Sequence, residues 1–391
     1  MVCLRNKPPI DKKILHSRSI HGESVHDWIA RFRFSYFAHT AKTAIFKLRQ
    51  LLKMESGAEL LAPSYNCGSE IDALMKSGFS IQLYSVSEDL RIDVADLRRR
   101  ISGNTRVVYV IHYFGHPQDL SEVMALKEEF GFVLVEDCAL SILSTWRGRP
   151  VGSCGDIAVF SLAKSLPVID GGVLATNNPE IGGGLAWELR NPPFLRIALL
   201  LLKSVKACIC PRLFPIAYMK SRVVQGGHID HGKEAISNRE EEAIHTFADM
   251  PRGYYYDGSL TNLGISSLSL RVLKAVDVNH IVRKRRANYS AMLDVVRKCT
   301  RARPLFGDLP EGVNPLNFPV IVKNNRSIAK KFKEAGIEAI SWWCGYHNGV
   351  SFEEFTSAVF LKENVLTIPI HESLRNRHLE FIRKAVASYL S

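Results

Sequence analysis

Residues 107–137 read VVYVIHYFGHPQDLSEVMALKEEFGFVLVED, and this stretch decides the fold class. The β-branched run at 107–111 predicts a buried strand, and the spacing of apolar residues over 121–130 predicts an amphipathic helix. A second strand is expected at 132–135. A strand, a helix and another strand in this order are typical of two parallel strands joined by a crossover helix.

The same alternation continues on both sides of this stretch. Short apolar runs predict strands at 60–62 and 81–84 before it, and at 157–160 and 172–175 after it. A helical period over 43–54 belongs to the same series. The pattern therefore predicts an α/β fold with a mostly parallel sheet and helices on both faces, whose ligand site lies at the carboxyl ends of the strands.

Changes in composition divide the chain into three parts. Residues 1–30 are polar and broken, which predicts an N-terminal arm. Residues 31–275 form the large α/β domain, with an insertion at about 181–240, and residues 276–391 are expected to form a smaller C-terminal α+β domain.

Composition excludes several classes of protein. The chain has 391 residues, of which 46% are hydrophobic and 23% charged, so a disordered chain is excluded. Lys plus Arg exceed Asp plus Glu by 51 − 39 = 12, which favours anionic partners. Eight scattered cysteines without a secretory signal indicate a reduced, cytoplasmic protein. Neither a second Cys pair for a metal site nor a nucleic-acid-reading motif is present in the sequence, so no metal and no nucleic acid are expected.

The insertion carries much of the positive charge. Residues 181–222 hold seven basic residues and one acidic residue, which gives 7 − 1 = +6. Residues 194–219 are also rich in aliphatic side chains, and Arg196, Lys203 and Lys206 share one helical stripe. Three interpretations stay open for this segment: a buried helix, a dimer contact, or peripheral contact with an anionic membrane surface on the inner face.

Four features near predicted strand ends carry the chemistry. Residues 40–44 start a helix and suit a phosphate, while Glu136-Asp137 place carboxylates after a buried strand. Lys164 can form a Schiff base with an aldehyde, and Gly171-Gly172 let the chain pass close to a ligand. Together they match a ligand with a phosphate, a basic ring nitrogen and an aldehyde, and pyridoxal 5'-phosphate (PLP) has all three.

These motifs resemble a known family. LAPSY at 61–65, the strand at 107–115, VLVED at 133–137, Lys164 and the following Gly-Gly are similar to the DegT/DnrJ/StrS sugar aminotransferases. The resemblance implies the fold of fold-type-I PLP enzymes, with a seven-stranded-type sheet. It also implies a homodimer that transfers an amino group from glutamate or glutamine to a keto sugar, usually a nucleotide-linked one.

The resemblance also assigns residues. Lys164 matches the lysine that binds the cofactor aldehyde, and Asp137 matches the acid that holds the pyridinium proton. Lys42, Thr43 and Ser161 match family positions that bind the cofactor phosphate. Tyr65 or Cys67 lies where the family places a residue over the pyridine face. Asn262 matches an asparagine that the partner subunit offers to the phosphate in the family dimer.

The sequence departs from the family at several positions. Ser161 precedes the lysine by three residues where many members have five, and Lys42 replaces a glycine. Leu140 stands where Gln or His is usual, and Gly264 stands where an arginine is common. Lys164 itself argues against the sugar-dehydrating branch, whose members carry a histidine there. The departures bear on the substrate more than on the cofactor.

Two further functions remain compatible with the sequence. One is an aminotransferase for a cyclitol or another ketone without a nucleotide, and the other is a catalytically inactive scaffold with the same fold. The principal hypothesis is that the chain is an enzyme of amino-sugar biosynthesis for polysaccharide, lipopolysaccharide or a secondary metabolite. Outside the site, His112 and His116 are expected to serve packing and a turn, and the basic run 283–286 is expected to be a solvated helix face.

Overall fold

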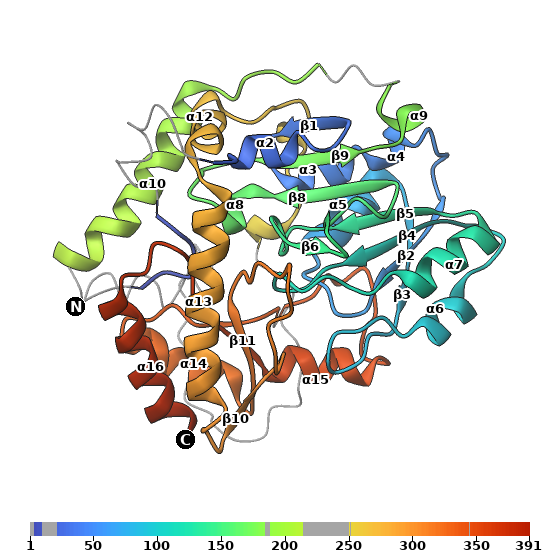
Figure 1. Cartoon of the computed structure of the whole chain (residues 1–391). Helices are drawn as coiled ribbons and strands as arrows, with labels where there is room; N and C mark the ends of the chain where they lie inside the picture. The colour runs from blue at the N-terminus through green and yellow to red at the C-terminus, as the bar shows by residue number, and fades with distance from the viewer. Residues whose placement is uncertain (1–3, 10–21, 184–187, 214–249, 251, 344) are drawn as a thin grey trace, which may run out of the picture.

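The structure, a computed structural model, describes residues 4–9, 22–183, 188–213, 250, 252–343 and 345–391. Within these residues a seven-stranded sheet with helices on both faces forms the larger part of the molecule. A four-stranded sheet with its own helices forms the smaller part, below the large sheet in Figure 1.

The large sheet has the strand order β1-β9-β8-β5-β4-β2-β3. Its strands are β1 (Phe34–Ala38), β2 (Glu59–Pro63), β3 (Ser80–Tyr84), β4 (Thr105–Ile111), β5 (Val133–Asp137), β8 (Ile157–Ser161) and β9 (Gly172–Thr176). Strand β9 runs antiparallel to both of its neighbours, β1 and β8, and all pairs from β8 to β3 are parallel. The mostly parallel sheet predicted from the sequence is confirmed, and so is the seven-stranded type that the family resemblance implies.

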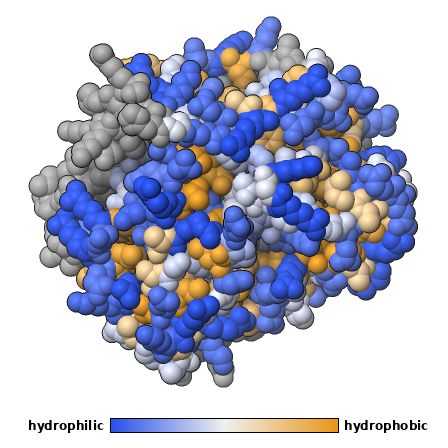
Figure 2. Space-filling view, viewed as in Figure 1, coloured by the Kyte–Doolittle hydropathy of each residue, from blue (hydrophilic) through white to orange (hydrophobic). Residues whose placement is uncertain are grey.

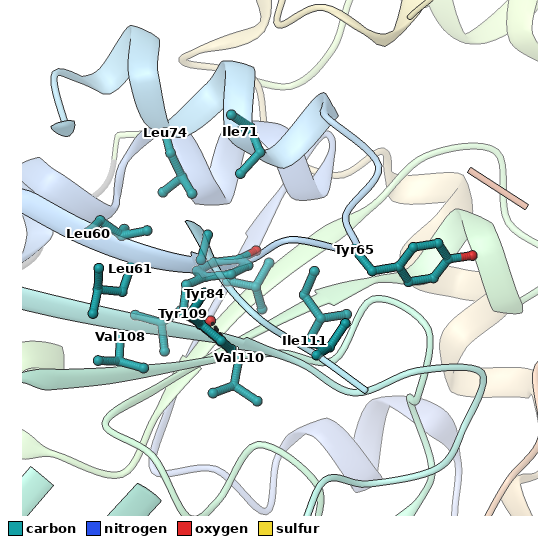
Figure 3. Packing of buried hydrophobic residues seen from close by; sticks show 14 of the residues in the cluster. Leu60, Leu61, Tyr65, Ile71, Leu74, Tyr84, Val108, Tyr109, Val110 and Ile111 are labelled. Carbon is teal, nitrogen blue, oxygen red and sulfur yellow. Dashed lines mark hydrogen bonds between the residues drawn. The ribbon is translucent and has the colours of Figure 1, made fainter. Parts of the chain in front are cut away.

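Both faces of this sheet are buried. Along β8, Ile157 and Val159 face one hydrophobic cluster, while Ala158 and Phe160 face the other. This alternation follows the two-residue period of a strand, and burial on both faces explains why the strands read as continuous apolar runs. Figure 3 shows the first cluster, in which Leu74 of a covering helix packs over the sheet residues Leu60 and Leu61.

Short helices link the strands and cover the sheet (Figure 1). Their bounds are α3 (Ala41–Phe46), α4 (Leu48–Leu51), α5 (Ser69–Ser77), α6 (Val94–Arg100), α7 (Ser121–Phe130), α8 (Leu162–Ser165), α9 (Pro179–Gly182) and α12 (Ser267–Ala275). Two-residue strands β6 (Thr145–Trp146) and β7 (Arg149–Pro150) form a hairpin, and η1 (Arg252–Tyr254) and η2 (Gly258–Leu260) are 3-10 turns. The single helix expected over 43–54 is wrong, because the chain breaks at Lys47 into α3 and α4.

The described part of the expected N-terminal arm packs against the rest of the molecule. Helix α2 (Val25–Ile29) is fixed at its start by a capping box between Ser24 and Asp27. Its Trp28 ring meets Phe160 of β8 edge-on, with centroids 5.6 Å apart. Nearer the start of the chain, Leu4 lies in the core of the smaller part. Residues 10–21 of the arm lie outside the described residues.

The smaller part is an antiparallel sheet with helices. Its strand order is β10-β11-β13-β12, with β10 (Ala302–Pro304), β11 (Phe318–Val322), β12 (Ile340–Ser341) and β13 (Val365–Ile368). The helices are α13 (Val278–Val296), α14 (Asn325–Glu334), α15 (Thr356–Asn364) and α16 (Asn376–Leu390). The long helix α13 runs from the large part to the small one (Figure 1), so it carries the chain between them.

Helix α10 (Phe194–Leu213) lies at the outside of the molecule (Figure 1). Four of its apolar side chains are exposed: Phe194, Leu195, Leu199 and Leu202. Among the described residues, no helix has the length and apolar character needed to cross a membrane. The face shown in Figure 2 is mainly hydrophilic, with hydrophobic side chains in separate patches. Residues 214–240 of the expected insertion lie outside the described residues.

We expect Gly172→Ala to destabilise the fold. A Cβ at Gly172 would lie 2.2 Å from the backbone of Thr40 and Ala41, and backbone at the start of α3 cannot move away as a flexible side chain would. The free energy of unfolding should fall by about 2 kcal/mol or more, as overpacking does elsewhere. Urea unfolding measures this change.

Gly103→Ala is the matched control, since no atom lies within 4 Å of a Cβ there. A Gly172→Ala protein as stable as the Gly103→Ala protein would show that α3 does not pack on β9 as described.

Candidate functional site at the carboxyl edge of the sheet

The candidate site lies where the parallel strands end. Asp137 is the last residue of β5 and Ser161 the last residue of β8, the neighbouring strand. The register pairs Asp137 with Val159, so Ser161 extends two residues further at the same edge. Lys164 follows on α8, and Cys67 follows β2. Parallel strands thus bring residues that are far apart in the sequence to one edge.

Asp137 is a buried and oriented carboxylate, 5% exposed. The Tyr109 hydroxyl donates to its Oδ2 at 2.7 Å, and the Ala139 N–H donates to its Oδ1 at 2.8 Å. Each oxygen therefore has one fixed partner and keeps a second lone pair. Tyr109 comes from β4, the next strand along, so two adjacent strands hold this carboxylate in place.

Lys164 is half-buried and lines a cavity of about 240 Å³. Ser161, Thr40 and Gly171 line the same cavity. The positive φ of Gly171, +125°, is a conformation that side-chain-bearing residues rarely adopt, and the turn it makes brings the chain back beside Ser161. The structure thus brings Lys164 and Ser161 together.

Two buried acidic groups follow β2. Burial raises the pKa of Glu70, and the Asp137 carboxylate raises it further, whereas Lys164 lowers it. Burial also raises the pKa of the Cys67 thiol, which therefore stays protonated and unreactive at neutral pH. Lys164 lowers both pKa values, so Cys67 and Glu70 lie within electrostatic reach of the lysine. Glu70 was not singled out from the sequence, because its burial depends on the tertiary structure.

Lys42 and Thr43, expected at the phosphate, form bonds within the chain. The Lys42 ammonium donates to the carbonyls of Gly253, Tyr254 and Tyr255 at 3.3, 2.8 and 3.0 Å. Thr43 is fully buried, and its hydroxyl lies 3.1 Å from that of Thr40. Lys42 thus holds the segment that follows the insertion against α3.

Tyr65 and Asn262 lie apart from the cavity beside Lys164. The Tyr65 side chain points away from the other labelled residues in Figure 3, and its hydroxyl donates to the Trp342 carbonyl at 2.9 Å. The Asn262 Oδ1 accepts from Lys47 at 3.1 Å on an exposed surface. Neither Tyr65 nor Asn262 lines that cavity. The sequence-based assignments of these two residues remain predictions.

His112, Glu136 and Cys138 lie close enough together to hold a metal ion. His112 Nδ1 accepts from the Gln118 N–H at 2.9 Å, so its Nε2–H donates to Glu136 at 2.8 Å. The Glu136 carboxylate also accepts from the backbone of Gly152, Cys154 and Gly155. These atoms are thus engaged within the protein, and the group fastens a loop to the sheet edge. The packing role expected for His112 agrees with these contacts.

A buried acid–histidine pair, His39 and Asp170, lines the cavity and was not assigned a role from the sequence. His39 Nδ1 lies 3.0 Å from Asp170 Oδ2. Asp170 also accepts from the Ser266 N–H at 2.9 Å, the Ser266 hydroxyl at 2.7 Å and the Ser269 hydroxyl. Burial opposes ionisation of Asp170, but hydrogen bonds from His39, Ser269 and Ser266 outweigh it and hold the pKa of Asp170 below its ordinary value.

The basic run 283–286 is only partly a solvated face. Arg285 is 1% exposed and bonds Glu372 through Nε at 2.9 Å and Nη2 at 2.8 Å. It also donates to the carbonyl of Ser165, the residue after Lys164. The expectation is wrong for Arg285, because α13 buries residues at helical spacing, and Arg285 lies on the same buried face as Ile281 and Asn288.

Two departures from the family pattern have structural consequences. Leu140 is 1% exposed and belongs to the hydrophobic core, so it offers no polar group to a ligand. At Gly264 a Cβ would lie 3.3 Å from Leu189 Cβ and 3.4 Å from the Phe37 carbonyl oxygen. A larger side chain would therefore crowd its neighbours. Neither Leu140 nor Gly264 therefore offers the polar side chain that is usual at its position in the family.

The architecture and the site geometry define an α/β protein whose lysine and acid share one sheet edge. Residues 39–190 match the DegT/DnrJ/EryC1/StrS aminotransferase family. The matched segment contains Thr43, Asp137, Ser161 and Lys164, and the resemblance predicted from the sequence is confirmed there.

Two curated proteins and a solved structure are also similar to this chain. Over 133 residues the chain is 28% identical to GDP-perosamine synthase of Escherichia coli O157:H7 and equally to that of Vibrio cholerae. Each match covers 33% of this chain and 36% of the relative, so the chain spans about a third of the length of these curated relatives. The structure of Helicobacter pylori PseC, an aminotransferase involved in the biosynthesis of pseudoaminic acid, covers 100% of this chain and 97% of its own, with a TM-score of 0.67 and 15% identity. At that identity the likeness shows the fold.

The buried His116 predicts a loss of stability in acid. It stacks on Phe306 with ring centroids 3.8 Å apart, and burial lowers its pKa to about 4. The unfolded chain takes up this proton near pH 6.5 and the folded chain near pH 4, so the free energy of unfolding falls as the pH drops through this window. The full loss from this residue is about 3 kcal/mol.

Urea unfolding at pH 7 and pH 4.5 measures this loss. His116→Phe keeps a ring against Phe306 and removes the titrating group, so the variant should lose less stability between the two pH values. His371, whose pKa burial also lowers to about 4, should keep part of the effect in the variant. An unchanged pH dependence would contradict the buried position of His116.

Proposed function

We propose that this chain is a PLP-dependent aminotransferase that transfers an amino group from glutamate or glutamine to a keto sugar. Its setting would be amino-sugar biosynthesis for polysaccharide, lipopolysaccharide or a secondary metabolite. The observation that carries the proposal is the pair formed by Asp137, the last residue of β5, and Lys164, which follows the adjacent parallel strand β8 on α8. Both lie inside the family-matched segment. The names of the GDP-perosamine synthases favour a nucleotide-linked sugar.

The described residues fit the cofactor. PLP requires an amine for its aldehyde, a carboxylate for its ring nitrogen and cations for its phosphate. Lys164 offers a half-buried amine at a cavity of about 240 Å³. Asp137, which does not line that cavity, offers a buried carboxylate that accepts one hydrogen bond on each oxygen from the described residues. Three basic side chains, those of Lys7, Lys164 and Arg196, line the cavity, and burial together with Lys164 lowers the pKa of Lys7. Bound PLP would supply an electrophilic aldehyde and a ring that accepts carbanion charge.

Residues of the chain itself bind the cofactor, orient it and transfer protons. The Lys164 Nζ holds the aldehyde and, once released, moves a proton as general base and general acid. Asp137 holds the proton on the ring nitrogen, and the Tyr109 hydroxyl and the Ala139 N–H keep its carboxylate in one orientation. The protonated Cys67 thiol offers a neutral surface near the lysine.

The proposal predicts that Lys164→Ala abolishes covalent cofactor binding. Wild-type protein with PLP should show a visible absorption band that glutamate bleaches, and borohydride should fix the cofactor to the peptide that contains Lys164. Lys164→Ala should show neither signal and should lower kcat by about 10³-fold, as loss of a general acid–base group does.

Lys274→Ala, at an exposed position on α12, is the matched control and should behave as wild type. A wild-type protein with no visible band and no borohydride adduct would overturn the proposal and favour the inactive scaffold.

We further propose a homodimer with peripheral membrane contact through 194–219, at the inner, cytoplasmic face. Phe194 and Leu195 on α10 are 86% and 69% exposed, and the sequence around them carries a charge of +6. An exposed aliphatic face with basic neighbours suits an anionic lipid surface.

Serine at Phe194, Leu195, Leu199 and Leu202 together should reduce flotation with vesicles that contain phosphatidylglycerol and leave the dimer mass unchanged in light scattering. Equal flotation would reject membrane contact, whereas a monomeric variant would show that this face is the dimer contact.

A further inference from the structure

The cavity beside Lys164 has a wall that the family-matched segment does not supply. Helix α10, from the insertion, contributes Arg196 and Leu200, and the N-terminal segment contributes Lys7. All three lie outside residues 39–190. Two segments far apart in the sequence therefore add cations to the cavity that contains Lys164.

The N-terminal segment is held in place by backbone pairing with the small domain. The Leu4 N–H donates to the Gly336 carbonyl at 2.7 Å, and the Glu338 N–H donates to the Leu4 carbonyl at 2.8 Å. The Asn6 N–H donates to the Glu338 carboxylate at 2.9 Å. Lys7 follows directly, so its place at the cavity follows from an anchored backbone.

Arg196 is oriented by the buried His39–Asp170 pair. The Arg196 Nε lies 3.2 Å from His39 Nε2, and because a guanidinium can only donate, Nε2 must accept. The imidazole is therefore neutral, and its Nδ1–H donates to Asp170 at 3.0 Å. Asp170 thus fixes the ring of His39, and His39 fixes Nε of Arg196. Neither Nη group of Arg196 has a hydrogen bond to another described residue, so both can bind an anion.

The charges at the cavity favour an anionic ligand. Asp170 is the single carboxylate among its described lining residues, and that carboxylate already accepts four hydrogen bonds. Asp257 attracts Arg196 at longer range, but its Oδ1 is bound by the Ser259 N–H at 3.0 Å and the Ser259 hydroxyl at 2.7 Å. Glu338 attracts Lys7, but burial and the neighbouring Lys164 still lower the pKa of Lys7. Basic groups around a cavity that has no free carboxylate among its described lining residues favour the entry of an anion.

We infer that Arg196, held by His39 and Asp170, binds the phosphate of the cofactor. This inference rests on the proposed function. In that function Asp137 and Lys164 serve the ring nitrogen and the aldehyde, and Lys42 is bound to three backbone carbonyls. Lys7 and Arg196 are the basic side chains of the cavity that remain for the phosphate. Arg196 presents planar N–H donors that match a phosphate. Helix α10 is thus part of the cofactor site.

Pyridoxal, which lacks the phosphate, gives the discriminating experiment. Apo-protein is titrated with PLP and with pyridoxal, and tryptophan fluorescence reports binding. Arg196→Gln should weaken PLP binding about 10- to 100-fold, the usual effect of losing hydrogen bonds to a charged group. The same variant should bind pyridoxal within about twofold of wild type, because the interaction it lacks involves only the phosphate.

Arg190→Gln is the matched control, with the same change of charge at an exposed position six residues earlier. It should bind both compounds as wild type does. Equal PLP affinity in Arg196→Gln would overturn the inference, and so would an equal loss for PLP and pyridoxal, because both results deny a phosphate-specific role.

Inorganic phosphate separates this inference from the proposed function. If wild type binds neither PLP nor pyridoxal, the proposed function fails. Phosphate should still raise the thermal midpoint of wild type and not that of Arg196→Gln if Arg196 forms an anion site. An equal rise in both proteins would overturn the anion site as well.

Discussion

Charged groups buried at the carboxyl edge of one sheet are the constraint on which the site depends. A buried carboxylate is costly unless hydrogen bonds or cations compensate it. Asp137 obtains its compensation from Tyr109 and Ala139, and Asp170 obtains its from His39 and two serines. Each acid therefore fixes the segments around it, and the precision of the site follows from the need to satisfy these charges.

The small domain takes part in the same arrangement. Arg285 of α13 bonds Glu372 and also the Ser165 carbonyl next to Lys164. Lys362 of α15 is 1% exposed and donates to the Asn66 carbonyl at 3.0 Å and the Gly345 carbonyl at 3.0 Å. Two buried cations thus connect the small domain to the segments that carry Lys164 and Cys67. A movement of the small domain would therefore displace the segments that carry Lys164 and Cys67.

The insertion gives this chain features that its family match does not contain. Helix α10 exposes Phe194 and Leu195 to the outside, while Arg196 and Leu200 face the cavity beside Lys164. One helix thus presents an apolar surface outward and a cation inward. At Leu140 and Gly264 the polar groups usual in the family are missing. These differences concern ligand recognition, whereas Asp137 and Lys164 match the family pattern.

The sequence by itself determined the alternating strands and helices, the mostly parallel sheet, and the positions of Lys164 and Asp137 at strand ends. These features are local, because periodicity and strand ends are encoded within a few neighbouring residues. The sequence did not predict the break at Lys47 or the burial of Arg285, because packing against other elements decides both. Only the tertiary structure brought together Arg196, His39 and Asp170. Their separations of 157 and 131 residues leave no local pattern, and the contact forms only when the sheet edge, α10 and the start of α3 have met.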